Sequence, residues 1–151
     1  MPGYKQHIFG ALFILALALI VIIPLCPVTL MQIVEWAAVL VFGSLFPDLD
    51  TKSMGQKWFY RALFFIALIL FIGKRYYVIS FLMLISLIPL LVNHRGLFHS
   101  TWFLATVVMC GGIFLTGSLP CHKDRIIYDL LFFWLGALSH VWLDRFYFFK
   151  K

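Results

Sequence analysis

Charged residues are scarce in this chain, and their scarcity argues against a soluble globular protein. Only 12% of the 151 residues are Asp, Glu, Lys or Arg, whereas 64% are hydrophobic and the mean hydropathy is +1.02. Soluble domains are about 25% charged, and a chain of this length has at most one core in which to bury apolar side chains. The composition therefore indicates a single integral membrane domain covering residues 1–151.

Three further absences narrow the function. The cysteines, Cys26, Cys110 and Cys121, are far apart and form no CxxC pair, which argues against a zinc ribbon or a disulfide framework. No run of Lys and Arg exceeds two residues despite a net charge of +6, so we expect helix-end anchors and no nucleic-acid surface. The His-Glu-x-x-His spacing of metalloproteases is also missing, which disfavours peptide or amide hydrolysis.

Long apolar runs separated by short polar stretches predict an all-α, multi-pass transmembrane bundle of about six helices. The runs cover residues 8–25, 28–46, 58–73, 76–92, 101–117 and 126–147. We expect the first run to be an uncleaved helix, because no small-residue cleavage site follows it. Gly111 and Gly112 in the fifth run would allow either a close helix approach or a bend.

Six spans would place both termini and the loops at 47–57 and 93–100 on one side of the membrane. The basic residues of that side are Lys5, Lys52, Lys57, Arg61, Arg95, Arg145, Lys150 and Lys151. Those of the other side are Lys74, Arg75, Lys123 and Arg125. This excess predicts, by the positive-inside rule, that both termini are cytoplasmic. Arg95 and Arg145 are the two that we expect to do more than anchor a helix.

The same predicted side collects most of the histidines and several carboxylates. The candidate residues are His7, Asp48, Asp50, His94, Arg95, His99, His140 and Asp144. His140 and Asp144 are four residues apart, so on a helix they lie about 40° from each other and can hold one metal ion. An aspartate within an apolar helix is costly, and a bound cation would remove that cost.

Nitrogen and oxygen ligands without thiolates suit a divalent first-row metal, with zinc expected and manganese as the alternative. One or two ions are expected, and a pair of ions can supply hydroxide at neutral pH and clamp both oxygens of a phosphoester displacement. Arg95 would then bind a phosphate oxygen and His94 would protonate the leaving group, which makes both candidate catalytic residues. The expected substrate is a membrane lipid or lipid-linked phosphate, because the site would open at headgroup level.

Each candidate also has a structural explanation. A single histidine at a helix end is usually only hydrogen-bonded. Asp48 could be a turn residue, Asp50 a cap for the next helix, and Asp144 the partner of Arg145 in a surface pair. Glu35, a helix-packing group, and His122, a loop residue, lie toward the other side. The alternative function is a non-catalytic membrane protein, either a transporter or a structural factor, although a transporter would carry polar groups through its midplane.

The order of the polar blocks carries a resemblance. The blocks are His7-Ile-Phe-Gly10, Pro47-Asp-Leu-Asp50 with Ser53, His94-Arg-Gly-Leu-Phe-His-Ser100 and Ser139-His-Val-Trp-Leu-Asp144. Together they look like the YdjM-like membrane-bound metal-dependent hydrolases, which implies the bacterial inner membrane and a metal-site plan similar to zinc-dependent phospholipase C. The resemblance would make the ligands His7, Asp48 or Asp50, His99, His140 and Asp144, with Asp144 able to bridge. The chain lacks that enzyme's later His and His-x3-Glu pair, so one or two ions are expected and three are not.

Overall fold

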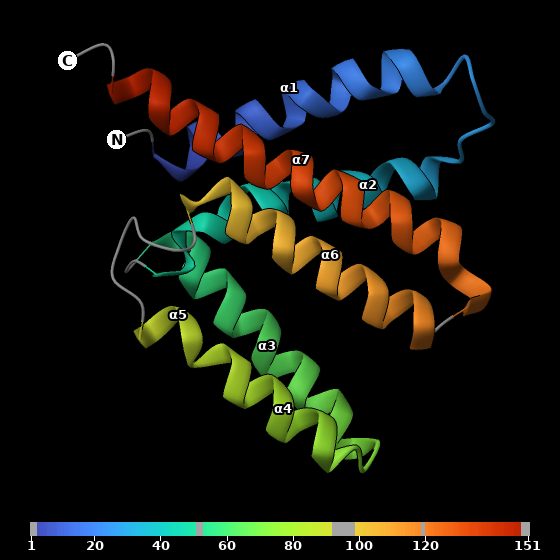
Figure 1. The fold of residues 1–151 in the computed structure, drawn as a ribbon. Helices are drawn as coiled ribbons and strands as arrows, with labels where there is room; N and C mark the ends of the chain where they lie inside the picture. Colours follow the sequence, from blue (N-terminus) through green and yellow to red (C-terminus); the bar gives the residue numbers. More distant parts are fainter. Residues whose placement is uncertain (1–2, 51–52, 92–98, 119, 149–151) are drawn as a thin grey trace.

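The computed structural model describes residues 3–50, 53–91, 99–118 and 120–148, and over these ranges the chain is all-helical (Figure 1). The main helices are α1 (Tyr4–Ile22), α2 (Leu30–Leu45), α3 (Met54–Ile72), α4 (Tyr76–Ser86), α6 (Thr101–Ser118) and α7 (Lys123–Phe148). Short helical turns join some of them: η1 (Phe46–Asp50), α5 (Ile88–Leu91) and η3 (Pro120–His122). The predicted all-α bundle of about six helices is confirmed.

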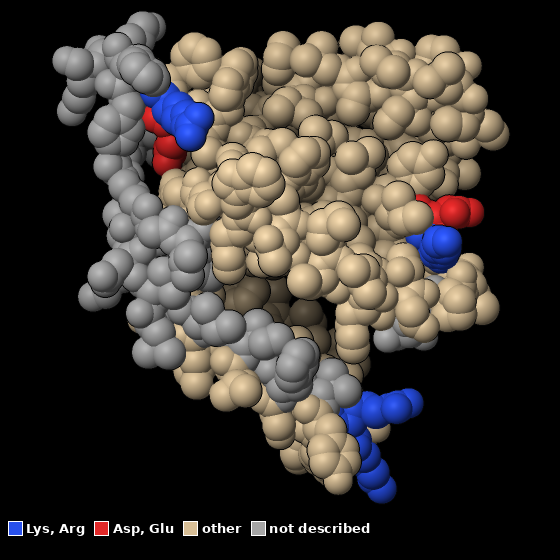
Figure 2. Space-filling view, in the orientation of Figure 1, with Lys and Arg blue, Asp and Glu red and all other residues tan. Residues whose placement is uncertain are grey.

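Among the described residues, four helical segments are long and apolar enough to cross a membrane. They are Tyr4–Ile22, Leu30–Leu49, Met54–Ile72 and Pro120–Phe146, and α6 adds a shorter apolar helix over Thr101–Gly117. On the face drawn in Figure 2, charged side chains lie near the ends of the helices and uncharged residues cover the surface between them. Large apolar side chains such as Phe9, Ile72 and Ile113 are more than 70% exposed, as expected of a surface that contacts lipid.

The prediction of a single helix over residues 76–92 is wrong, because the described part of this segment forms two helices. α4 ends at Ser86 and α5 begins at Ile88, with Pro89 directly after the break. Proline has no N–H to donate to the carbonyl four residues earlier, and its ring crowds that carbonyl. The chain instead makes tighter turns, in which the Leu87 N–H donates to the Leu84 carbonyl and the Leu90 N–H to the Leu87 carbonyl.

Three helices begin earlier than their apolar runs predicted, and the first of them is α1, which starts at Tyr4 and not at residue 8. α3 starts at Met54, because the Ser53 side chain accepts a hydrogen bond from the Gln56 N–H and so caps the helix. α7 starts at Lys123, so residues 123–125, which were expected in a loop, form its first turn. Polar residues are frequent in a first helical turn, which is why an apolar run marks the buried part of a helix better than its start.

The core lies where α2 crosses α7, with α1 and α6 packed beside α7 (Figure 1). Glycines on both helices permit the crossing. A Cβ added at Gly136 would clash with the carbonyl oxygen of Leu40, and one added at Gly43 would clash with that of Phe133. The backbones therefore touch, as small residues allow in membrane bundles. Beside this contact Trp36 stacks on Phe132 with ring centroids 4.8 Å apart.

The expected close approach at Gly111 and Gly112 is much weaker than this crossing. A Cβ at Gly112 would lie 3.1 Å from a methyl carbon of Leu130 on α7, whereas one at Gly111 would meet nothing within 4 Å. The helix α6 continues through both glycines without a break. The tightest glycine contacts of the described bundle are thus on α2 and α7.

Candidate metal centre

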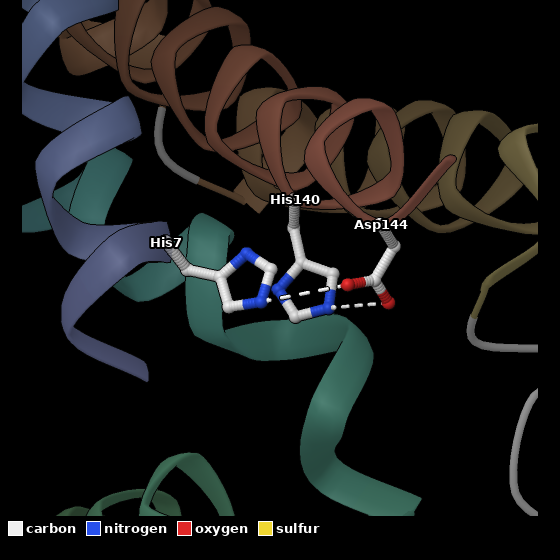
Figure 3. A group of neighbouring side chains, drawn as sticks. All are labelled: His7, His140 and Asp144. Atoms are coloured by element: carbon white, nitrogen blue, oxygen red, sulfur yellow. Dashed lines mark ion pairs between the residues drawn. The ribbon is translucent and has the colours of Figure 1, made fainter. Parts of the chain in front are cut away.

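Five of the candidate ligands come together at the end of the bundle where α1 begins and α7 ends. They are His7 from α1, Asp48 from η1, His99 just before α6, and His140 and Asp144 from α7. Figure 3 shows three of them, with the rings of His7 and His140 and the carboxylate of Asp144 pointing toward one another. Residues up to 137 positions apart in the chain (144 minus 7) therefore share one site.

Four nitrogen–oxygen pairs of the potential ligand atoms are 3.4–3.7 Å apart. Asp144 Oδ1 lies 3.6 Å from His7 Nε2, and Asp144 Oδ2 lies 3.4 Å from His99 Nε2 and 3.7 Å from His140 Nε2. His140 Nε2 is also 3.4 Å from Asp48 Oδ1. Asp144 is thus the centre of the cluster, because its two oxygens face different histidines.

A backbone contact sets the orientation of His140. The ring is fully buried, and its Nδ1 lies 2.6 Å from the carbonyl oxygen of Ser44 on α2. A carbonyl only accepts hydrogen bonds, so Nδ1 carries a proton, and in the neutral ring the lone pair is then on Nε2. This is the tautomer in which a histidine binds a metal through Nε2 while a second group holds its other nitrogen. In the part of the chain that the structure describes, His140 Nε2 has no hydrogen-bond partner.

The Ser44 carbonyl is available for this contact for a local reason. Ser44 lies in the last turn of α2, where carbonyl groups lack helical donors. Pro47, three residues later, has no N–H with which to close a tight turn onto it. The close crossing at Gly43 and Gly136 then brings α7 within reach, so the packing of two helices determines the tautomer of His140.

His7 is held between α1 and α7. It is 1% exposed, and its ring stacks on that of His140 with centroids 3.7 Å apart and planes 12° apart. One turn later along α1, a Cβ at Gly10 would lie 2.6 Å from a methyl carbon of Leu143. The glycine therefore lets α1 approach α7 closely at the level of the cluster.

Asp48 is positioned by the turn η1 and by the start of α3. Ser53 Oγ donates to the Asp48 carbonyl at 2.9 Å, and Gln56 Nε2 donates to the Leu49 carbonyl at 3.0 Å. The alternative in which Asp50 caps the next helix is wrong, because Ser53 has that role. The side chain of Asp50 lies outside the described part of the structure, and so do His94 and Arg95.

The donor set and its spacing fit a divalent metal ion. Two ligand atoms on one tetrahedral zinc, each about 2.0–2.2 Å from the metal, are about 3.3–3.6 Å apart. The four nitrogen–oxygen distances in the cluster, 3.4, 3.4, 3.6 and 3.7 Å, lie at or close to this range. Two groups of three ligands, His7 with His140 and Asp144, and Asp48 with His99 and His140, each have their ligand atoms within 4.8 Å of one another. His140 belongs to both groups, so either group would offer three ligands to a divalent ion, and the five residues together would supply ligands for one or two ions.

The remaining polar residues of the prediction lie elsewhere. Glu35 accepts hydrogen bonds from Arg125, with its Oε1 2.7 Å from Nε and 2.6 Å from Nη2, at the opposite end of α7 from the cluster. His122 is exposed in η3 near that end. Arg145, which follows Asp144 in the chain, is exposed and lines a groove on the outer surface.

Apart from Gly10, which belongs to the first block of the resemblance, the residues that position the ligands were not predicted from the sequence. Ser44, Gly43, Gly136 and Gly10 contribute backbone atoms or empty space, which have no chemical signature. A usable indication was the concentration of small residues one turn before the histidine, Gly136-Ala137 and Ser139 before His140, because small residues mark close helix contacts in membranes.

Comparison with known proteins identifies the family. The family model described as YdjM inner membrane protein matches residues 1–149. Neither a curated protein nor a solved structure was found to match the chain. The family description agrees with the apolar helices of the fold in placing the protein in the inner membrane. The chain, matched over nearly its whole length, belongs to the YdjM inner membrane protein family.

Proposed function

We propose that this protein is a metal-dependent hydrolase that cleaves a phosphoester of a lipid or lipid-linked substrate at the membrane surface. One observation carries the proposal: three histidines and two aspartates from distant parts of the chain bring their nitrogen and oxygen atoms together, in two overlapping groups of three, at the end of an apolar bundle. Burying ionisable groups beside a membrane costs free energy, so such groups usually have a function.

The charges of the cluster support the phosphoester assignment. Asp48 and Asp144 would balance the charge of one divalent ion, so a second ion would leave the site with a net positive charge that could attract a phosphate. A bound divalent ion supplies Lewis acidity and lowers the pKa of water, which is the chemistry that phosphoester hydrolysis needs. The protein's own part is to hold the ligands in place, through the Ser44 contact of His140 and the turn that presents Asp48.

The sequence adds two catalytic assignments and an orientation. Arg95 would bind the phosphate and His94 would protonate the leaving group, and both rest on their place in the block that ends at His99. Both termini would be cytoplasmic, which puts the cluster at the headgroup level of the inner leaflet. We expect Arg95→Ala to lower kcat/KM strongly while the bound metal remains.

Metal content and hydrolysis, measured on the same purified samples, test the proposal. Elemental analysis is combined with a screen of phospholipid and isoprenoid-phosphate hydrolysis, with and without a chelator. The wild type should contain one or two ions of zinc or manganese per chain and lose activity with chelator. The double variant His140→Ala with Asp144→Ala should lose both the metal and the activity.

The chain also offers a matched control, a histidine and an aspartate near the start of α7. His122→Ala with Asp124→Ala removes the same residue types from exposed positions at the opposite end of the bundle, and it should change neither readout. Full metal occupancy in the His140 and Asp144 variant would refute the site. Stoichiometric metal without turnover of any of these phosphoesters would instead support the non-catalytic alternative.

A further inference from the structure

An apolar groove of about 380 Å³ runs along the outer side of α7, bordered by α1 and α6. Its wall includes Leu135, Leu138 and Trp142 of α7, with Ile14 of α1 and Thr101 of α6 at its sides. Arg145 lies at one end. The groove is open to the surroundings at Trp142, which is 62% exposed, whereas Ser139 and Val141 in its wall are buried.

The basic end of the groove is at the level of the metal cluster. Arg145 directly follows Asp144, and Thr101 is two residues after His99. Successive residues of a helix differ by about 100° in direction but by only about 1.5 Å along the axis. The groove and the cluster therefore face different sides of α7 while they end at the same depth.

The dimensions of the groove match one leaflet of a bilayer. From Leu135 to Arg145 the helix advances ten residues, or about 15 Å. The hydrocarbon core of a bilayer is about 30 Å thick, so this length is half of it. An apolar groove of this length with a guanidinium at its polar end is complementary to a single lipid. The groove would contact the hydrocarbon chain, and the guanidinium would contact the anionic phosphate.

We propose that this groove binds the hydrocarbon chain of the substrate and that Arg145 binds its phosphate, which deepens the proposed hydrolase function and rests on it. The groove selects lipids that have both a long chain and a phosphate at its polar end. Arg145 is a binding residue in this role, and it holds the phosphate at the same depth in the membrane as the cluster.

Native mass spectrometry of the metal-loaded protein, released from detergent, tests the groove through binding alone. Three probes separate the contribution of the hydrocarbon chains from that of the phosphate. Phosphatidic acid has both, diacylglycerol has only the chains, and glycerol 3-phosphate has only the phosphate headgroup. Leu138→Trp fills the groove, and Arg145→Gln removes its cation without disturbing packing. Leu68→Trp, an exposed leucine on α3, is the control for adding a large side chain to the lipid-facing surface.

One phosphatidic acid should bind to each wild-type chain. Its affinity should be about tenfold lower for Leu138→Trp and for Arg145→Gln, and unchanged for Leu68→Trp. Diacylglycerol binding should weaken only in Leu138→Trp. Equal binding of phosphatidic acid to all four proteins would show unspecific surrounding lipid and overturn the proposal. If Arg145→Gln weakened the binding of diacylglycerol as much as that of phosphatidic acid, the proposed role of Arg145 in binding phosphate would be overturned.

The two proposals fail in different ways. Intact, variant-sensitive lipid binding without any hydrolysis would refute the proposed function and leave the groove standing. Hydrolysis that does not depend on chain length, and that Leu138→Trp does not change, would refute the groove and leave the function standing.

Discussion

Gly136→Ala is the substitution that most directly tests how the fold builds the candidate metal centre. The added methyl group would clash with the Leu40 carbonyl oxygen and lie 2.9 Å from the Ser44 nitrogen and 3.0 Å from the Leu40 carbonyl carbon. All of these are backbone atoms of α2, so no side-chain rotation can relieve the contact. The two helices must move apart.

The expected displacement can be estimated from these distances. Ordinary van der Waals contacts of a Cβ begin at 3.4 Å, so the Ser44 nitrogen alone requires a shift of half an ångström, and the clash with Leu40 requires more. A separation of about 1 Å would lengthen the His140–Ser44 contact from 2.6 Å to about 3.6 Å, where it is no longer a hydrogen bond. Losing such an outer partner typically lowers metal affinity about 10- to 100-fold, and the overpacking costs about 1–3 kcal/mol of stability.

Metal affinity by competition with a chelator, and thermal unfolding in detergent, measure the two effects. The control is Gly111→Ala, in which the added methyl group meets nothing within 4 Å and should slightly favour the helix. We expect Gly136→Ala to lose metal affinity and stability and Gly111→Ala to lose neither. Unchanged zinc affinity in Gly136→Ala would refute the argument that the α2–α7 crossing holds His140 in its metal-binding orientation.

Two other predictions follow from the fold, and a third follows from the distribution of basic residues. Ser53→Ala should cost about 1 kcal/mol and weaken metal binding, because Ser53 caps α3 and holds the Asp48 carbonyl, whereas Thr29→Ala, which removes the cap of α2, should leave metal binding unchanged. Removing the metal with a chelator should lower the unfolding midpoint, and zinc at 100 times its Kd should restore about 2.7 kcal/mol; the His140→Ala and Asp144→Ala variant should show no such recovery. A fluorescent reporter fused to the C-terminus should be active in cells and a periplasm-dependent reporter inactive, and the opposite pattern would invert the orientation.

The helices themselves were largely predictable, because an apolar run reports directly on which residues avoid water. The errors have local causes. The break before Pro89 follows from the missing N–H of proline, whose presence in the run was visible but whose effect on the helix was not anticipated. The early starts of α1, α3 and α7 follow from polar first turns that hydropathy does not register.

The candidate ligands were also accessible from the sequence. His140 and Asp144 follow from helical spacing, and His7, Asp48 and His99 follow from the alternation of helix ends across a membrane. Their distances from one another could not be predicted, because these depend on the angle and depth at which α1, α2 and α7 cross. The sequence likewise could not separate Asp48 from a simple turn residue, and it is the structure that places the Asp48 carboxylate 3.4 Å from His140.

By itself, the sequence determined that this is an all-helical membrane protein with its histidines and aspartates at helix ends, because composition and periodicity are local properties of the chain. Only the tertiary structure decided that two glycines bring α2 against α7, that a backbone carbonyl orients His140, and that Asp144 lies between three histidines. Those features arise from contacts between segments distant in the chain, where close packing of backbones decides which polar atoms meet.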